Sequence, residues 1–353
     1  MIDVFLVEDS PIALQILTKI ISDAPDLRVV GTADNGRDAL LAIPQANPDV
    51  VCTDLYMKGI DGLELIQQLM SRFPKPILVI SVAVGADNPE NVFQLLQAGA
   101  IDVFPKPTTG LPSDYNKDEL INKIRVLAGV KVVTRTSHSL VVNSASPTPS
   151  RKGVNAPTQP TTPINIVAIG ASTGGPQAIF KILRVLPKDF PVPIICTQHI
   201  SAGFLDGLVS WMNKECQLTI KIAQQGEALQ PGVVYYAPDG FNLEVDRQQR
   251  IYLSPPYAKE LHCPSVNVMF RSVALHYGSS SLGVLLTGMG EDGAQGMLAI
   301  VQAGGITLVQ DETSCVVFGM PKAAIDLGAA QYVLEVEKIG DFIRTIAGIA
   351  DRS

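Results

Sequence analysis

Residues 164–176 read Ile-Asn-Ile-Val-Ala-Ile-Gly-Ala-Ser-Thr-Gly-Gly-Pro. The mostly apolar run Ile164–Ile169 predicts a buried strand, the small residues after it a tight turn, and Pro176 the start of a helix. Units of this kind build α/β domains, in which helices cover a parallel sheet. The stretch therefore predicts a doubly wound α/β domain with Ser172 on the turn after a strand.

The same alternation continues to the end of the chain and predicts a domain over residues 164–348. The further segments expected to be strands are Pro193–Thr197, Val233–Tyr236, Arg250–Leu253, Leu282–Thr287 and Ile306–Val309. The expected helices are Pro176–Val185, Gly203–Asn213, Gly293–Ala303 and Ile339–Ala347. We expect the second and third of these strands to pair antiparallel around a turn at residues 238–240.

Residues 1–125 show a second alternation of short apolar runs and amphipathic segments. The expected strands are Val4–Val7, Arg28–Thr32, Val50–Thr53, Ile77–Ser81 and Asp102–Phe104. Helices are expected to begin near Pro11, Asn35, Gly62 and Pro89, and a last one to span Asn116–Leu127. This order of elements predicts a flavodoxin-like domain.

Between these domains the composition changes to serine and proline, with little aliphatic periodicity after Val142. Such a segment cannot bury enough apolar surface to offset its chain entropy. Residues 126–163 are therefore expected to form a flexible linker that lets the domains dock or separate.

The bulk composition excludes several classes of protein. A net charge of -7 argues against nucleic-acid binding, which needs basic side chains to contact phosphates. The five cysteines show no CxxC spacing and are expected to be reduced thiols. The sequence shows no signal peptide and no apolar stretch near the roughly 20 residues that a membrane helix needs. We expect a cytoplasmic protein that does not insert into the membrane and that functions as a monomer.

Carboxylates follow two of the strands predicted in the first domain. Glu8 and Asp9 follow the first strand and Asp54 follows the third, so all three should meet at the carboxyl edge of the sheet. Clustered carboxylates suit Mg²⁺, which would offset their repulsion and the charge of a phosphoryl group. Asp54 is the expected nucleophile, forming an acyl phosphate. Ser81 and Lys106, which follow the fourth and fifth strands, could bind the phosphoryl oxygens.

The second domain has the elements of a serine hydrolase. Ser172 lies in a G-x-S-x-G turn between a strand and a helix, the context of a nucleophile elbow. His199 follows the next strand and could act as its general base. Asp292 follows a later strand and could orient the imidazole. The order Ser…His…Asp differs from that of the α/β-hydrolases, so this would be a separate origin of the triad.

The same loop allows a different interpretation. Gly288-Met-Gly-Glu-Asp-Gly293 is formally a G-x-G-x-x-G after a strand, and Asp311 lies about 20 residues beyond it, as in dinucleotide-binding oxidoreductases. Against this, Glu291 and Asp292 inside the loop would repel a pyrophosphate.

Residues 1–125 resemble the receiver domain of bacterial response regulators. The landmarks are Val7-Glu-Asp-Ser10, Thr53-Asp-Leu-Tyr-Met57, Asp61-Gly62, Ser81 and Lys106-Pro107. Glu8 departs from the pattern, since Asp is more common there, but it keeps a metal-binding carboxylate. The resemblance implies an aromatic switch residue at Phe104.

The second domain resembles chemotaxis protein-glutamate methylesterases, the CheB family. The matching motifs are Ile169-Gly-Ala-Ser-Thr-Gly-Gly-Pro176, Gln198-His199, Tyr236-Ala-Pro-Asp-Gly240, Pro264-Ser-Val-Asn-Val268, Leu286-Thr-Gly-Met-Gly-Glu-Asp-Gly293 and Phe318-Gly-Met-Pro-Lys322. The resemblance implies Ser172 as nucleophile, His199 as base and Asp292 as orienting acid, with the backbone N–H groups of Thr173 and Met289 in the oxyanion hole. One departure is Phe241-Asn242, where histidine is more common, and we expect it to bear on substrate fit.

This resemblance implies a phosphorylation-regulated hydrolase that demethylates glutamate methyl esters on chemoreceptors and deamidates particular glutamines. It implies Mg²⁺ in the receiver domain, no metal for hydrolysis, and a chemotaxis histidine kinase as phosphodonor. It also implies that the unphosphorylated receiver covers the active site. The remaining alternative is a signalling scaffold whose hydrolase half is inactive.

Overall fold

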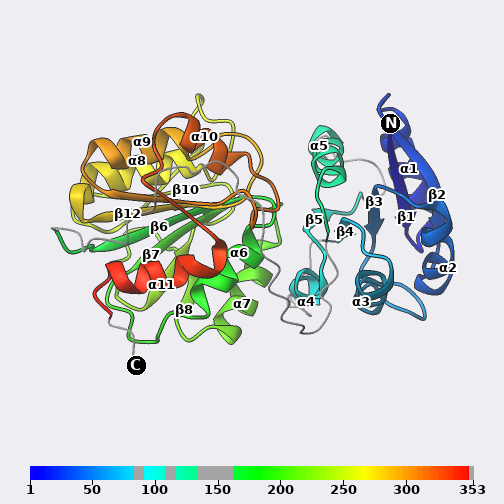
Figure 1. Cartoon of the computed structure of the whole chain (residues 1–353), viewed down its shortest axis with the longest axis horizontal. Coiled ribbons are helices and arrows are strands. Elements are labelled where there is room, and N and C mark those ends of the chain that lie inside the picture. Colours follow the sequence, from blue (N-terminus) through cyan, green and yellow to red (C-terminus); the bar gives the residue numbers. More distant parts are fainter. Residues whose placement is uncertain (83–90, 108–116, 133–161, 350–353) are drawn as a thin grey trace, which may run out of the picture.

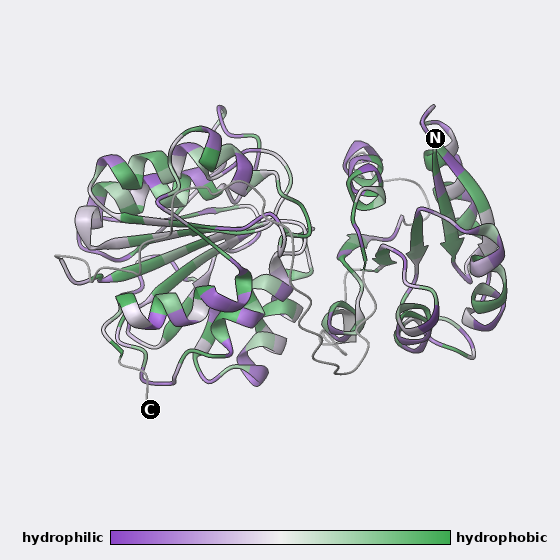
Figure 2. Cartoon of the chain, in the orientation of Figure 1, coloured by the Kyte–Doolittle hydropathy of each residue, from purple (hydrophilic) through white to green (hydrophobic). Residues whose placement is uncertain are grey.

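The computed structural model describes residues 1–82, 91–107, 117–132 and 162–349, which form two α/β domains side by side (Figure 1). Most of the predicted linker, residues 133–161, lies outside the described residues, as do Pro89 and Asn116. Green apolar residues are concentrated on the strands of both sheets, and the helices turn purple faces outward (Figure 2).

The N-terminal domain has a five-stranded parallel sheet in the order β2-β1-β3-β4-β5, with both faces covered by helices. Its strands are β1 (Ile2–Val7), β2 (Leu27–Ala33), β3 (Val50–Thr53), β4 (Ile77–Ser81) and β5 (Asp102–Pro105). Its helices are α1 (Pro11–Ser22), α2 (Gly36–Ala46), α3 (Gly62–Arg72), α4 (Asn91–Ala98) and α5 (Lys117–Ala128). The order 2-1-3-4-5 confirms the flavodoxin-like prediction.

Local signals explain these helices. The Ser10 hydroxyl caps α1 by accepting from the Ala13 N–H, and Asn35 and Asp61 cap α2 and α3 in the same way. The helix α5 continues through Ala128, three residues into the segment predicted as a linker.

The C-terminal domain has a seven-stranded parallel sheet in the order β14-β13-β12-β6-β7-β9-β8. Its strands are β6 (Ile166–Ala171), β7 (Ile194–Gln198), β8 (Thr219–Ile222), β9 (Val233–Tyr236), β12 (Ser281–Leu285), β13 (Ile306–Gln310) and β14 (Tyr332–Leu334). The helices α6 (Gly175–Leu183), α7 (Leu205–Glu215) and α11 (Val336–Ile346) cover one face, and α8 (Val266–Tyr277), α9 (Ala294–Gln302) and α10 (Met320–Asp326) the other (Figure 1).

The chain order reverses between β6 and β12 in this sheet. From β6 the chain proceeds to β7 on one side, and it later returns to place β12 on the other side. In open parallel sheets the carboxyl ends of the strands at such a switch point border the ligand-binding crevice. Ser172 directly follows β6, so the topology places it at this point.

One predicted strand pairing is wrong. The strand β9 does not pair with β11 (Ile251–Ser254) but lies parallel between β7 and β8. Instead, β11 pairs antiparallel with β10 (Asn242–Val245), which was not predicted. The turn of this hairpin is closed by the Asp246 carboxylate, which accepts from the Gln248 and Arg250 N–H groups. The near-complete burial of β9 is typical of a strand covered on both faces.

The two domains are in contact through α4 and β5 of the first and α6 and α7 of the second. The Phe93 and Trp211 rings stack at a centroid distance of 6.0 Å and an interplanar angle of 12°. The Gln177 side-chain amide donates to the Ala100 carbonyl at 2.8 Å.

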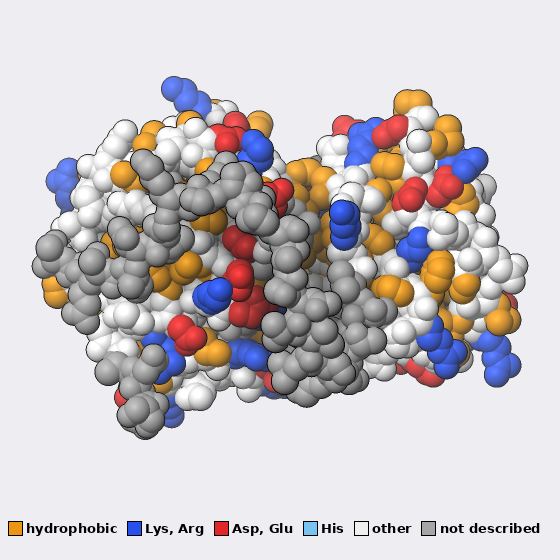
Figure 3. Space-filling model, viewed as in Figure 1, with side chains coloured by type: hydrophobic (Ala, Val, Ile, Leu, Met, Phe, Trp, Pro, Cys, Tyr) orange, Lys and Arg blue, Asp and Glu red, His pale blue; other side chains and the backbone are white. Residues whose placement is uncertain are grey.

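On the face shown in Figure 3, basic and acidic side chains are interspersed over both domains. Among the described residues no helix combines the length and apolar character needed to span a bilayer.

The fold makes a test possible at Gly170, the penultimate residue of β6. A Cβ atom there would lie 2.2 Å from Cγ1 of Val266 in the first turn of α8. Overpacking of this kind costs about 1–3 kcal/mol, so Gly170→Ala is expected to lower the free energy of unfolding by that amount. Trp211, the single tryptophan of the chain, reports unfolding of this domain by fluorescence in a denaturant titration. Gly129→Ala is the control, because the nearest atom to its added Cβ is 3.4 Å away. Equal stability of the two variants would contradict the prediction.

Candidate active site and phosphorylation site

Ser172 lies in a tight turn between β6 and α6. Its N–H donates to the Thr287 carbonyl at 3.0 Å, and its own carbonyl accepts from the Gly175 N–H at 2.8 Å. Gly174, the N-cap of α6, has a φ of 77°, a conformation that favours glycine. The turn therefore has the strand–turn–helix context of a nucleophile elbow, and the Ser172 side chain stays partly exposed.

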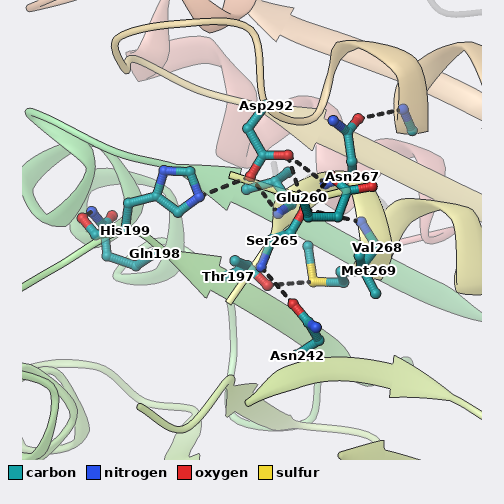
Figure 4. A network of polar contacts seen from close by, with 12 residues as sticks. Thr197, Gln198, His199, Asn242, Glu260, Ser265, Asn267, Val268, Met269 and Asp292 are labelled. Atoms are coloured by element: carbon teal, nitrogen blue, oxygen red, sulfur yellow. Dashed lines mark hydrogen bonds and ion pairs between the residues drawn. The ribbon is translucent and has the colours of Figure 1, made fainter. Parts of the chain in front are cut away.

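His199 follows β7 and is held beside this turn. Its backbone N–H donates to the Ala171 carbonyl at 2.9 Å, and Nε2 of its ring lies 2.9 Å from Oδ2 of Asp292 (Figure 4). The side-chain amide of Gln198 donates to the carbonyls of both Ser172 and His199. Since Nε2 is engaged by Asp292, Nδ1 is the ring nitrogen left to exchange a proton with Ser172.

Asp292 is held by the N-terminus of α8. Its carboxylate accepts from the Val266 N–H at 2.8 Å, the Asn267 N–H at 2.9 Å and the Ser265 hydroxyl at 3.0 Å (Figure 4). Helix N-termini stabilise anions through their free N–H groups and dipole.

These contacts decide the charge of Asp292. Burial raises the pKa of this carboxyl, but the hydrogen bond and charge of His199 and the two backbone N–H groups outweigh it and lower the pKa from 3.8 to about 2. Asp292 is therefore ionised at neutral pH. The carboxylate favours the folded state above pH 3.8, and this contribution is lost as the pH falls toward 2.

Three residues at this site were missed by the sequence prediction. Ser265 caps α8 and bonds Asp292, a role that a serine before an apolar run can signal. The Asn242 side chain is buried and accepts from the Ser265 N–H at 2.9 Å, so it supports the residues around Asp292, and its bearing on substrate fit stays a prediction. The ring of His262 stacks on that of His199, which no local pattern indicates.

Both residues predicted for the oxyanion hole lie next to Ser172. Thr173 follows it directly, in the turn before Gly174, the N-cap of α6. Met289 is in the loop between β12 and α9, and this loop packs on the serine turn: a Cβ added to Gly288 would lie 2.7 Å from Cβ of Ser172. The loop Gly288–Gly293, which matches the dinucleotide-binding pattern, therefore packs against Ser172 and directs Asp292 toward His199.

The acidic residues of the first domain meet as predicted. Ligand atoms of Glu8, Asp9 and Asp54 lie within 4.8 Å of one another at the ends of β1 and β3. Nζ of Lys106 is 2.6 Å from both Oε1 of Glu8 and Oδ2 of Asp54. Ser81 is fully buried at the end of β4, and its hydroxyl has no hydrogen-bond partner among the described residues.

The charges of this cluster fit a divalent cation. Burial raises the pKa of Glu8 above its ordinary value. Burial also lowers the pKa of Lys106, but Asp54 and Glu8 outweigh this effect and raise it overall, so the ammonium stays charged. One ammonium faces three carboxyl groups, and the buried Oε2 of Glu8 has no hydrogen-bond partner among the described residues. Hard oxygen ligands with unbalanced negative charge are what Mg²⁺ binds.

Phe104, the predicted switch residue, is in β5 and only 2% exposed. It packs in the core between the sheet and α5. Asp102, two residues before Phe104 in β5, reaches the second domain: its Oδ2 accepts from the Thr173 hydroxyl at 3.1 Å and from Lys123 at 2.6 Å. A carboxylate of the first domain therefore contacts the residue next to Ser172.

Comparison with known proteins identifies the family. Residues 4–114 match the response regulator receiver domain and residues 167–343 match the CheB methylesterase family. The chain is 40% identical over 352 residues to protein-glutamate methylesterase/protein-glutamine glutaminase 2 of Methanospirillum hungatei, covering 98% of this chain and 99% of that protein. It is 37% identical to protein-glutamate methylesterase/protein-glutamine glutaminase 1 of Syntrophus aciditrophicus, covering 99% of each.

A solved structure supports the same assignment. The CheB methylesterase catalytic domain of Thermotoga maritima is 38% identical, with a TM-score of 0.51, over 52% of this chain and 100% of that one. These matches displace the oxidoreductase and scaffold alternatives. The chain belongs to the CheB methylesterase family, with an N-terminal response regulator receiver domain joined to the methylesterase domain.

Proposed function

We propose that Ser172, His199 and Asp292 are the catalytic triad of this enzyme and that Asp54 is its phosphorylation site. As a member of its family the chain is a protein-glutamate methylesterase and protein-glutamine glutaminase, regulated by its receiver domain and acting in chemotaxis adaptation. The observation that carries the triad is the 2.9 Å contact between His199 and an Asp292 whose charge is held by α8.

The proposed reaction begins with attack of Oγ of Ser172 on the carbonyl carbon of a glutamate γ-methyl ester. Nδ1 of His199 takes the hydroxyl proton, and Asp292 stabilises the imidazolium that forms. The backbone N–H groups of Thr173 and Met289 are the proposed donors to the oxyanion. His199 then protonates the leaving methoxide, which departs as methanol.

Water completes the cycle. It attacks the acyl-enzyme while His199 accepts its proton, and the products are the free glutamate carboxylate and Ser172. For a glutamine substrate the same steps release ammonia in place of methanol. All of these groups are within one chain, so a monomer is sufficient, and none of the steps uses a metal ion.

The receiver domain is proposed to accept a phosphoryl group on Asp54 from a chemotaxis histidine kinase. Glu8, Asp9 and Asp54 are the residues that would hold Mg²⁺, which when bound would offset the charge between carboxylate and phosphoryl group. Lys106 and the hydroxyl of Ser81 are placed at the adjacent strand ends and would bind phosphoryl oxygens. Phe104 is proposed to respond through β5, the strand that also bears Asp102.

The proposed regulation is a shift between a docked and an open arrangement of the two domains, which are joined by the segment between α5 and residue 164. In the docked arrangement the receiver contacts Thr173 and Gln177, both within five residues of Ser172. Phosphorylation at Asp54 would weaken this contact and admit the chemoreceptor substrate. A phosphoryl group that favours the open state over the docked state is sufficient to shift the population of the two states in this way.

Replacement of the nucleophile tests the triad. Ser172→Ala is expected to lower the release of radiolabelled methanol from methylated receptor membranes by at least about a thousandfold, because no group replaces the serine oxygen. Ser71→Ala, at an exposed serine of α3, is the matched control and should keep the wild-type rate. Substantial activity in Ser172→Ala would refute the proposed mechanism.

The phosphorylation site is tested by the ratio of rates with and without a small phosphodonor and Mg²⁺. The wild type is expected to be stimulated, whereas Asp54→Asn should show no stimulation because an amide cannot form the acyl phosphate. A chelator should abolish stimulation of the wild type. Asp23→Asn, an exposed position after α1, should respond like the wild type. Stimulation of Asp54→Asn would place the phosphoryl group elsewhere.

The docked interface is tested at Gln177. Gln177→Ala removes the hydrogen bond to Ala100. The docked state is expected to lose about 1 kcal/mol of stability relative to the open state. This shift raises the rate of methanol release without phosphodonor by up to roughly fivefold. The stimulated rate should change little. Gln295→Ala, on the exposed face of α9, is the control. An unstimulated rate that falls or stays constant would argue against inhibition by docking.

A further inference from the structure

The imidazole of His199 is held by a hydrogen bond at one edge and by a second ring on its face. The His262 ring lies at a centroid distance of 4.4 Å from it, with an interplanar angle of 28°. The His199 side chain is only 13% exposed, whereas His262 is exposed and lies on the outer side of the pair. His262 therefore covers the imidazole that the proposed reaction uses.

The segment that carries His262 is anchored on both sides. Before it, the Glu260 carboxylate accepts from Arg271 of α8 at 2.6 Å. After it, the Ser265 N–H donates to the buried Asn242, and the Ser265 hydroxyl donates to Asp292. The segment Glu260–Ser265 is thus fastened to α8, the helix whose N-terminus holds Asp292, and His262 is placed between these anchors.

The hydrogen bond to Asp292 alone does not define the plane of the His199 ring, because the ring can still turn about that contact. The reaction requires Nδ1 to face Ser172 while Nε2 stays hydrogen-bonded to Asp292. A flat ring packed on the face of the imidazole enforces this orientation. Misplacement of a catalytic group by about 1 Å can cost a hundredfold in rate. Stacked aromatic pairs contribute about 0.5–1.5 kcal/mol.

We propose that His262 is a positioning residue, whose ring packs on the face of His199 and keeps that imidazole aligned between Ser172 and Asp292. This inference rests on the proposed triad.

The electrostatic surroundings of His262 agree with this role. The titratable groups that face it are His199, Asp292 and Glu260. Partial removal of water and the charge of His199 lower the pKa of His262, and Asp292 and Glu260 oppose this effect only in part. His262 is therefore neutral near neutral pH. A neutral ring adds no repulsion when His199 gains a proton in the reaction, whereas a protonated His262 would oppose that step.

The test uses the full chain with saturating phosphodonor and Mg²⁺, and methylated receptor membranes as substrate. His262→Ala is expected to lower kcat by roughly three- to tenfold without a change in KM, the range that loss of a stacked pair implies. His262→Phe keeps a flat ring and is expected to retain kcat within about twofold. His276→Ala, at the end of α8, is the control and should match the wild type.

The pH profile tests the neutral state of His262. In the wild type kcat should fall more steeply toward acidic pH than in His262→Phe, because a protonated His262 places a positive charge beside the ring that must accept the serine proton.

Three results would overturn the inference: a wild-type kcat in His262→Ala, a loss confined to KM, or a His262→Phe variant as slow as His262→Ala. Ser172→Ala is measured in the same assay. Activity in that variant would remove the proposed triad itself, whatever the His262 variants show.

Discussion

The arrangement of the second domain depends on one interaction, the capture of the Asp292 carboxylate by the first turn of α8. Two backbone N–H groups and the Ser265 hydroxyl surround this carboxylate and keep it charged, so its remaining contact can hold Nε2 of His199. The close approach of α8 to β6 requires Gly170, and the same strand delivers Ser172. The helix that holds Asp292 is therefore packed on the strand that positions Ser172, the proposed nucleophile.

The turn after β6 also receives the contact from the receiver domain. Thr173 donates to Asp102, the first residue of β5, which lies at the opposite end of that strand from Ser81 and Lys106. Asp54 contacts Lys106, which directly follows β5, and Asp102 is the first residue of the same strand. Asp102 and Thr173 are both buried, so their hydrogen bond is shielded from solvent.

Much of both sheets could be predicted, because buried parallel strands are continuous apolar runs in the sequence. The hairpin of β10 and β11 was not, since its strands have only four residues each and its turn is formed by Asp246 and not by the Pro-Asp-Gly segment. The helix α8 was missed as well. Its β-branched residues Val266, Val268 and Val273 resemble a strand, and only packing against β6 and α9 and the Ser265 cap favour the helix.

The sequence by itself determined two α/β domains, the acids gathered at the edge of the first sheet, and the turn on which Ser172 lies. These features follow from local periodicity and from the rule that parallel strands end at one edge. Only the tertiary structure decided which nitrogen of His199 meets Asp292, that Ser265 and Asn242 support this pair, that His262 covers it, and that Asp102 reaches Thr173. Each of these contacts joins residues from separate elements, and their approach depends on helix packing that no local pattern encodes.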